Sequence, residues 1–202
     1  MSPRGVPTPD VHNRLIAATE RVLRRDGPAG VSARTVAKEA DCAIGVLYKH
    51  FEDLDDLLAA VVVDWFGGVA AELAGLVARA GTGTVAENLV VGGRRFAGSP
   101  ALAVVALIQT RPGIMARLLA ALEAGAPGLP AIERAFAAYL EAEQKLGRVD
   151  ASADPGAVAV TLVGALHHAA VYPTLIGAPD DPDAREAVIT QAVDSLLRGS
   201  VR

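Results

Sequence analysis

Alanine, leucine and valine recur through this chain at helical spacing, and the alternation of β-branched and polar residues that marks a strand is nearly absent. Aromatic residues make up only 4% of the 202 residues. Four prolines stand near the beginnings of apolar stretches, where a missing backbone N–H costs little: Pro100, Pro112, Pro130 and Pro155. The pattern therefore predicts an all-α fold.

Capping residues and glycines divide the chain into helices. Asp10, Ser32 and Asp53 precede apolar stretches and are expected to be N-caps. Gly27-Pro28 is expected to end the first helix, and residues 81–84 to form a loop. We expect helices over about residues 11–25, 33–40, 43–50, 53–80, 85–97, 100–110, 113–124, 128–146, 154–175 and 183–198.

The charge of the chain is unevenly distributed. Its net charge is −4, yet residues 1–51 hold eight basic and five acidic residues, so this part carries +3 and the remainder −7. The acidic total argues against coating of nucleic acid by the whole surface, and it leaves room for a local basic face at the N-terminal end.

Three further features indicate the cellular compartment. Cys42 is the only cysteine, so no disulfide can form within the chain. The longest apolar runs are interrupted by Asp64 and by His167-His168 and fall short of about 18 uninterrupted apolar residues. The first ten residues contain three prolines and do not form a signal peptide. We expect a cytoplasmic protein that does not bind a membrane.

Two short expected helices, 33–40 and 43–50, are separated only by a turn at Asp41-Cys42 and follow a longer first helix. Three helices in this order form a helix-turn-helix, in which the last one is the recognition helix that enters the major groove of DNA. The segment "AIGVLYKHF" at residues 43–51 supplies that helix with a basic and aromatic end.

The same residues resemble a known family. Over about residues 13–61, the chain is similar to the N-terminal domain of TetR (tetracycline-repressor-like) transcriptional regulators. The resemblance implies a flexible arm at residues 1–9, a DNA-binding helix-turn-helix domain at 10–53, and a ligand-binding and dimerisation domain at 54–202. The positions that carry the resemblance are Ala37, Ala40, Gly45, Leu47, Tyr48, His50 and Phe51, followed by Leu57-Leu58.

The expected DNA contacts follow from side-chain chemistry. Tyr48 and His50 can pack a ring while a polar tip reaches phosphate, and Lys49 can displace counterions. Ile44 and Val46 can contact thymine methyl groups, and Gly45 leaves room for a close approach of the backbone. The full expected set is Ser32, Arg34, Ile44, Gly45, Val46, Tyr48, Lys49 and His50.

One stretch departs from the family pattern. Relatives usually open the fourth helix with a lysine that faces phosphate, whereas this chain reads "EDLDD" at residues 52–56, with Leu54 at that place. Carboxylates beside a duplex repel its phosphates. We therefore expect Glu52, Asp55 and Asp56 to weaken binding to DNA.

The resemblance implies that residues 54–202 sense a small molecule and form a homodimer through the last two helices. Apolar side chains with a few polar groups would line a ligand pocket, and small residues would let helices of two copies pack closely. Candidate ligand-binding residues are Trp65, Phe96, Gln109, Met115, Tyr139 and His167. Candidate dimer residues are Val158, Leu162, Ala165, Ala169, Val193 and Leu196.

The partners expected are thus a palindromic double-stranded operator, a second copy of the chain and a small hydrophobic effector whose binding releases a repressor. Two alternatives remain: a helical-bundle enzyme that uses His167 or His168 as a base, and a protein-interaction module. No catalytic order of residues or phosphate-binding loop supports an enzyme. Adjacent histidines on a helix point about 100° apart, so we expect neither a metal nor another cofactor.

Overall fold

The computed structural model describes residues 11–97, 108, 111–178 and 181–198, and in these residues it contains helices and no strand. The all-α prediction is confirmed. By contacts, the chain forms two compact units. We call residues 1–64 with 103–124 the head unit, and residues 65–102 with 125–202 the body unit. The predicted boundary between residues 53 and 54 stays a prediction.

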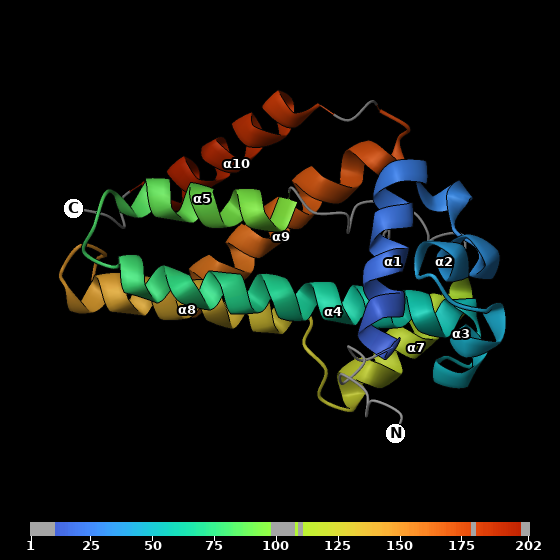
Figure 1. Ribbon diagram of the computed structural model, residues 1–202. Coiled ribbons are helices and arrows are strands. Elements are labelled where there is room, and N and C mark those ends of the chain that lie inside the picture. The colour runs from blue at the N-terminus through green and yellow to red at the C-terminus, as the bar shows by residue number, and fades with distance from the viewer. Residues whose placement is uncertain (1–10, 98–107, 109–110, 179–180, 199–202) are drawn as a thin grey trace, which may run out of the picture. The chain divides into compact units, whose positions relative to one another are not determined.

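The head unit begins with three helices, α1 (Val11–Asp26), α2 (Ala33–Glu39) and α3 (Ile44–His50), which contact one another (Figure 1). Ser32 caps α2 as expected: its hydroxyl accepts the N–H of Thr35 at 3.1 Å, and the Thr35 hydroxyl accepts the N–H of Ser32 at 2.9 Å. This reciprocal pair fixes the start of a helix too short to be stable by itself.

The turn between α2 and α3 depends on a left-handed residue. Asp41 has a φ of 51°, a conformation that aspartate tolerates better than most residues. The turn brings Leu47 and Phe51 into the core of the head with Leu15 and Val36, all of them buried. Phe51 also stacks on His12 of α1, with ring centroids 4.6 Å apart. The recognition helix is therefore anchored at its apolar side.

A long helix, α4 (Leu54–Ala74), follows and continues as a 3-10 turn, η2 (Gly75–Arg79). The sequence predicted one helix to about residue 80, and the structure differs only in the hydrogen bonding of this last turn. Asp53 caps α4 by accepting the N–H of Asp56 at 2.9 Å. The head unit is completed by α7 (Pro112–Glu123). The helix expected at 100–110 lies largely outside the described residues.

The body unit contains α5 (Val85–Ala97), α8 (Leu129–Lys145), α9 (Pro155–Leu175) and α10 (Pro182–Leu197), which end within two residues of the predicted bounds. Two glycines allow α5 to pack closely. A Cβ on Gly92 would lie 2.8 Å from the Phe136 ring, and one on Gly93 would lie 2.8 Å from Ile189. No other residue would fit there without displacing its neighbours.

Two helical segments are long and apolar enough to cross a membrane by length and composition alone. They are Leu54–Arg79, with a mean hydropathy of 1.7, and Pro155–Pro173, with a mean hydropathy of 1.3. The sequence argument from interrupted runs did not identify them, because a few polar residues do not prevent a high average. Core helices of globular domains have the same property, and one side of each segment is buried within the chain.

Candidate functional site

The recognition helix α3 has one buried side and one exposed side. Leu47 is fully buried, while Ile44 is 39% and Tyr48 54% exposed. Lys49 and His50 are exposed as well, and Val46 is half-buried. The exposed side of this seven-residue helix thus combines large apolar and aromatic side chains with two basic residues. Such a surface suits the major groove of DNA, whose edges carry phosphates.

Gly45 lies in the first turn of this exposed side. A Cβ built on it would meet no atom within 4 Å, so the glycine is not required by packing within the described residues. A glycine with open space in front of it permits another molecule to approach the backbone closely. Ser32 and Arg34 lie at the start of α2, where Arg34 is exposed and Ser32 is half-buried with its hydroxyl engaged in the helix cap.

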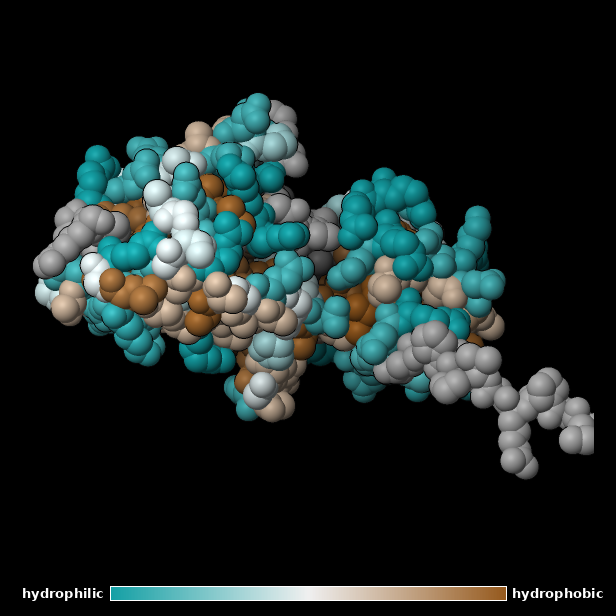
Figure 2. All heavy atoms as spheres, turned by 60° about the vertical axis from the view of Figure 1, so that its left-hand side comes forward, coloured by the Kyte–Doolittle hydropathy of each residue, from teal (hydrophilic) through white to brown (hydrophobic). Residues whose placement is uncertain are grey.

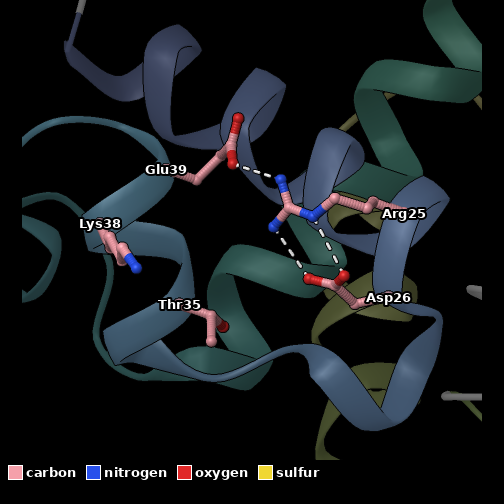
Figure 3. A pocket seen from close by; sticks show the side chains of 5 residues that line it. All are labelled: Arg25, Asp26, Thr35, Lys38 and Glu39. Carbon is pink, nitrogen blue, oxygen red and sulfur yellow. Dashed lines mark hydrogen bonds and ion pairs between the residues drawn. The ribbon is translucent and has the colours of Figure 1, made fainter.

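A shallow depression of about 430 Å³ lies between α1 and α2 (Figure 3). The Arg25 guanidinium spans it, with 2.7 Å from Nη1 to Glu39 Oε2 and 2.8 Å from Nη2 to Asp26 Oδ2. Hydrogen bonds from Arg25, and then from Arg21, lower the pKa of Glu39, and Arg25 also lowers the pKa of Asp26. These ion pairs join α1 to α2. Because Arg25, Asp26 and Glu39 already neutralise one another, the depression offers few unpaired charges to a ligand.

The acidic start of α4 has partners that the sequence did not indicate. Arg117 Nη2 lies 2.6 Å from Asp53 Oδ2, and Arg111 Nη2 lies 2.5 Å from Asp55 Oδ1. Both arginines belong to the segment around α7, about sixty residues away along the chain. No local pattern links two such distant segments, so only the tertiary structure could reveal the pairs.

Two of the candidate ligand-binding residues lie together in the body unit. The rings of Trp65 and Phe96 are 5.6 Å apart at 54°, and Phe66 lies 4.8 Å from Trp65. The indole Nε1 of Trp65 is buried and has no hydrogen-bond partner within the described part of the chain. A buried indole N–H normally finds an acceptor. This aromatic cluster therefore offers one unused donor in an apolar setting.

The other candidates are dispersed. Tyr139 lies in a buried polar network, where its hydroxyl donates to Glu143 at 2.6 Å and accepts from Asn88 at 3.0 Å. Burial, and then the Glu143 carboxylate, raise the pKa of Tyr139. Met115 is exposed in the head unit, and His167 is exposed on α9. Gln109 lies outside the described residues. The structure thus brings Trp65 and Phe96 together, whereas Tyr139 takes part in a buried hydrogen-bond network that stabilises the body unit.

The predicted dimer residues differ in accessibility, and the dimer interface stays a prediction. Leu162, Ala169 and Val193 are buried within the chain's own fold, because apolar residues occur all around α9 and the sequence could not distinguish its inner from its outer side. Val158, Ala165 and Leu196 are half-buried. The side of α9 that is open to another molecule is formed by Ala157, Val160, Thr161, Gly164, His167, His168 and Tyr172.

Hydrophobic side chains on the surface are visible as brown and tan among teal in Figure 2. Val160 is 53% exposed, and Tyr172 and Val188 are exposed too. The 21 residues of α9 include no aspartate, glutamate, lysine or arginine. An uncharged exposed helix side is typical of a surface that another protein covers. Among the described residues, no group of three or more His, Cys, Asp or Glu side chains could hold a metal.

The chain is similar to known proteins both in its N-terminal helices and in its fold. Residues 15–61 match the family described as bacterial regulatory proteins, tetR family. The nicotine-responsive transcriptional repressor HdnoR of Paenarthrobacter nicotinovorans is 36% identical over 59 residues, which are 29% of this chain and 30% of that repressor. The similarity to this curated relative thus spans less than a third of its length.

Solved structures resemble almost the whole chain. A TetR-family transcriptional regulator from Mesorhizobium loti aligns over 98% of this chain and 100% of its own, with a TM-score of 0.75 and 18% identity. A TetR-family regulator from Pectobacterium atrosepticum aligns over 95% of this chain and 94% of its own, with a TM-score of 0.67 and 24% identity. At these identities the likeness concerns the fold. Residues 15–61 therefore match the tetR family of bacterial regulatory proteins, and almost the whole chain shares the fold of solved regulators of that family.

Proposed function

We propose that this chain is a ligand-responsive transcriptional regulator that binds double-stranded DNA through α3 and is released from its operator by a small hydrophobic molecule. The observation that carries the proposal is the exposed side of α3, with Ile44, Tyr48, Lys49 and His50 held outward by the buried Leu47. Family and fold point to transcriptional regulators rather than enzymes.

The proposed contacts divide into two kinds. Lys49, His50 and Arg34 are exposed cations or polar groups that position the head on phosphate, and the Tyr48 hydroxyl can join them. Ile44 and Val46 have no hydrogen-bonding groups, so any base contact they make is an apolar one to thymine methyl groups. Gly45 permits the approach. Ser32 Oγ accepts the N–H of Thr35 in the cap of α2, so Ser32 would meet phosphate as the donor of its hydroxyl hydrogen.

We propose that a second copy covers the uncharged side of α9. Helix-turn-helix dimers read two half-sites about 34–36 Å apart, so a twofold pair of this chain would recognise a palindromic operator. Small residues such as Gly164 and Ala157 on that side allow a close helix–helix approach. Such a protein would act in the cytoplasm, where the operator is accessible.

We propose that the effector binds at the aromatic cluster of Trp65, Phe66 and Phe96. The apolar rings favour a hydrophobic or aromatic molecule, and the buried Trp65 Nε1 favours one hydrogen-bond acceptor on it. The relative HdnoR is named as nicotine-responsive, which supports a small organic effector. To act as a switch, the effector must bind the DNA-binding and released conformations with different affinity.

A salt titration on duplex DNA tests the proposal. The logarithm of affinity should fall steeply with the logarithm of salt concentration, because bound phosphates release counterions. Lys49→Gln should reduce that slope by about one. Lys145→Gln, which removes an exposed lysine from α8 in the body unit, should leave it unchanged. If the salt dependence of the affinity has the same slope for the wild type and Lys49→Gln, Lys49 does not contact phosphate and the proposed contact of α3 with DNA is wrong.

A further inference from the structure

Four carboxylates follow the recognition helix directly. Helix α3 ends at His50, and the next turn of chain contains Glu52, Asp53, Asp55 and Asp56. If these carboxylates had no basic partners, they would repel the phosphate backbone of DNA bound at α3. The chain therefore needs a way to offset them if the proposed function is correct.

Two arginines from the segment around α7 supply the opposite charge. Arg117 Nη2 lies 2.6 Å from Asp53 Oδ2 and 3.5 Å from Glu52 Oε2. Arg111 Nη2 lies 2.5 Å from Asp55 Oδ1. The Asp53 carboxylate has two separate roles, because its Oδ1 caps α4 while its Oδ2 binds Arg117. Three of the four carboxylates are thus paired.

The close approach of α7 to α4 is built into the sequence at Gly113. A Cβ at this position would lie 2.4 Å from Asp55 Oδ2 and 3.2 Å from Arg117 Nη1. Any other residue would require the Asp55 carboxylate, which pairs with Arg111, to move. Arg117 is also held in place by a hydrogen bond from its Nη1 to the Gly113 carbonyl at 3.4 Å. Arg117 is therefore held by contacts with both Asp53 and Gly113 within the head unit.

We propose that the segment carrying Arg111 and Arg117 is an electrostatic mask for the DNA-binding head. The two arginines offset the carboxylates at the start of α4, and affinity for duplex DNA depends on that compensation. The inference rests on the proposed function, since it concerns affinity for the same ligand.

A charge-compensation experiment tests the mask. Arg117→Gln leaves Asp53 unpaired and should weaken binding to a nonspecific duplex at low salt by about fivefold, an effect that higher salt reduces. The double variant Asp53→Asn/Arg117→Gln removes both charges, and asparagine caps a helix as well as aspartate does. If the mask is electrostatic, the double variant recovers wild-type affinity.

The second pair repeats the test with different residues. Arg111→Gln should weaken binding, and Asp55→Asn/Arg111→Gln should recover it. If either single variant fails to fold, as judged by circular dichroism, the other pair still decides the question. Arg134→Gln removes an exposed arginine from α8 in the body unit and is the control for loss of one positive charge. It should change the affinity less than twofold.

The outcomes separate this inference from the function on which it rests. If wild-type protein shows no salt-dependent binding to duplex, the proposed function fails. If wild-type protein binds while Arg117→Gln and Arg111→Gln bind equally well, the mask is disproved. It is also disproved if the double variants bind no better than the single ones, because the arginines would then act by supporting the fold and not by offsetting charge.

Discussion

The helices of the head and of the body differ in how clearly they separate an inside from an outside. Helix α1 places charged residues such as Arg21 and Arg25 on its outer side and Leu15 and Val22 inside. Helix α9 has apolar or small residues on both sides and no charged residue. A helix with charged residues on one side and apolar residues on the other shows which side faces solvent. A uniformly apolar helix can pack either on its own core or on another subunit.

Polar groups show a second difference. The ion pairs of the head described above are partly exposed to solvent, whereas Asn88 and Glu143 of the body are fully buried. Glu143 accepts hydrogen bonds from Tyr139 and from the Gly81 N–H, and Arg148 lies 3.3 Å from it. Buried polar groups are costly unless they are paired, so each member of this network depends on the others.

The largest effect on stability is expected for a substitution in the buried polar network of the body unit. Glu143→Ala should lower the free energy of unfolding by about 3 kcal/mol, because Tyr139 and Gly81 lose a buried acceptor and Arg148 its partner. Urea denaturation followed by circular dichroism measures the change. Glu141→Ala, at an exposed position on the same helix, should have almost no effect. A small loss at Glu143 would mean that the network contributes little.

An intermediate effect tests the outer side of α9. Val160→Glu should weaken the proposed dimer at least tenfold, because a carboxylate would be desolvated between two copies. Sedimentation analysis over a range of concentrations measures the association. Val77→Glu introduces the same charge at an exposed position in η2 and should not alter the dimer. If both variants associate like the wild type, the interface lies elsewhere.

The smallest effect concerns Glu20 in the head. Burial, and then the nearby Asp64 carboxylate, raise the pKa of Glu20 above its usual value. The folded protein therefore holds this proton more tightly than the unfolded chain, and the ionised form reduces stability as pH rises above the ordinary glutamate range. Glu20→Gln should raise the Tm by about 1 °C at pH 7, and the gain should vanish at acid pH. Glu123→Gln, exposed on α7, is the control.

The sequence was most informative where local chemistry decides the structure. Ser32 caps α2 and Asp53 caps α4 as predicted, and Leu47 and Phe51 are buried, because caps and apolar spacing act over a few residues. The division of α3 into an exposed and a buried side follows from the same spacing. The helix-turn-helix and its resemblance to the tetR family could be recognised from these signals alone.

Contacts between distant segments could not be predicted in this way. The pairing of Arg117 with Asp53, the close approach at Gly113 and the burial of Tyr139 beside Glu143 all depend on how helices pack. The same limit explains why Leu162 and Val193 were assigned to a dimer surface and prove to be buried in the chain's own core.

The sequence by itself determined the helices, their caps and the exposed basic end of the recognition helix, since each follows from interactions within one or two turns. The tertiary structure decided which side of α9 is open, which polar groups are buried, and how the acidic start of α4 is neutralised. These properties depend on neighbours that lie far away along the chain, and a local pattern of residues carries no information about which distant side chain will supply the opposite charge.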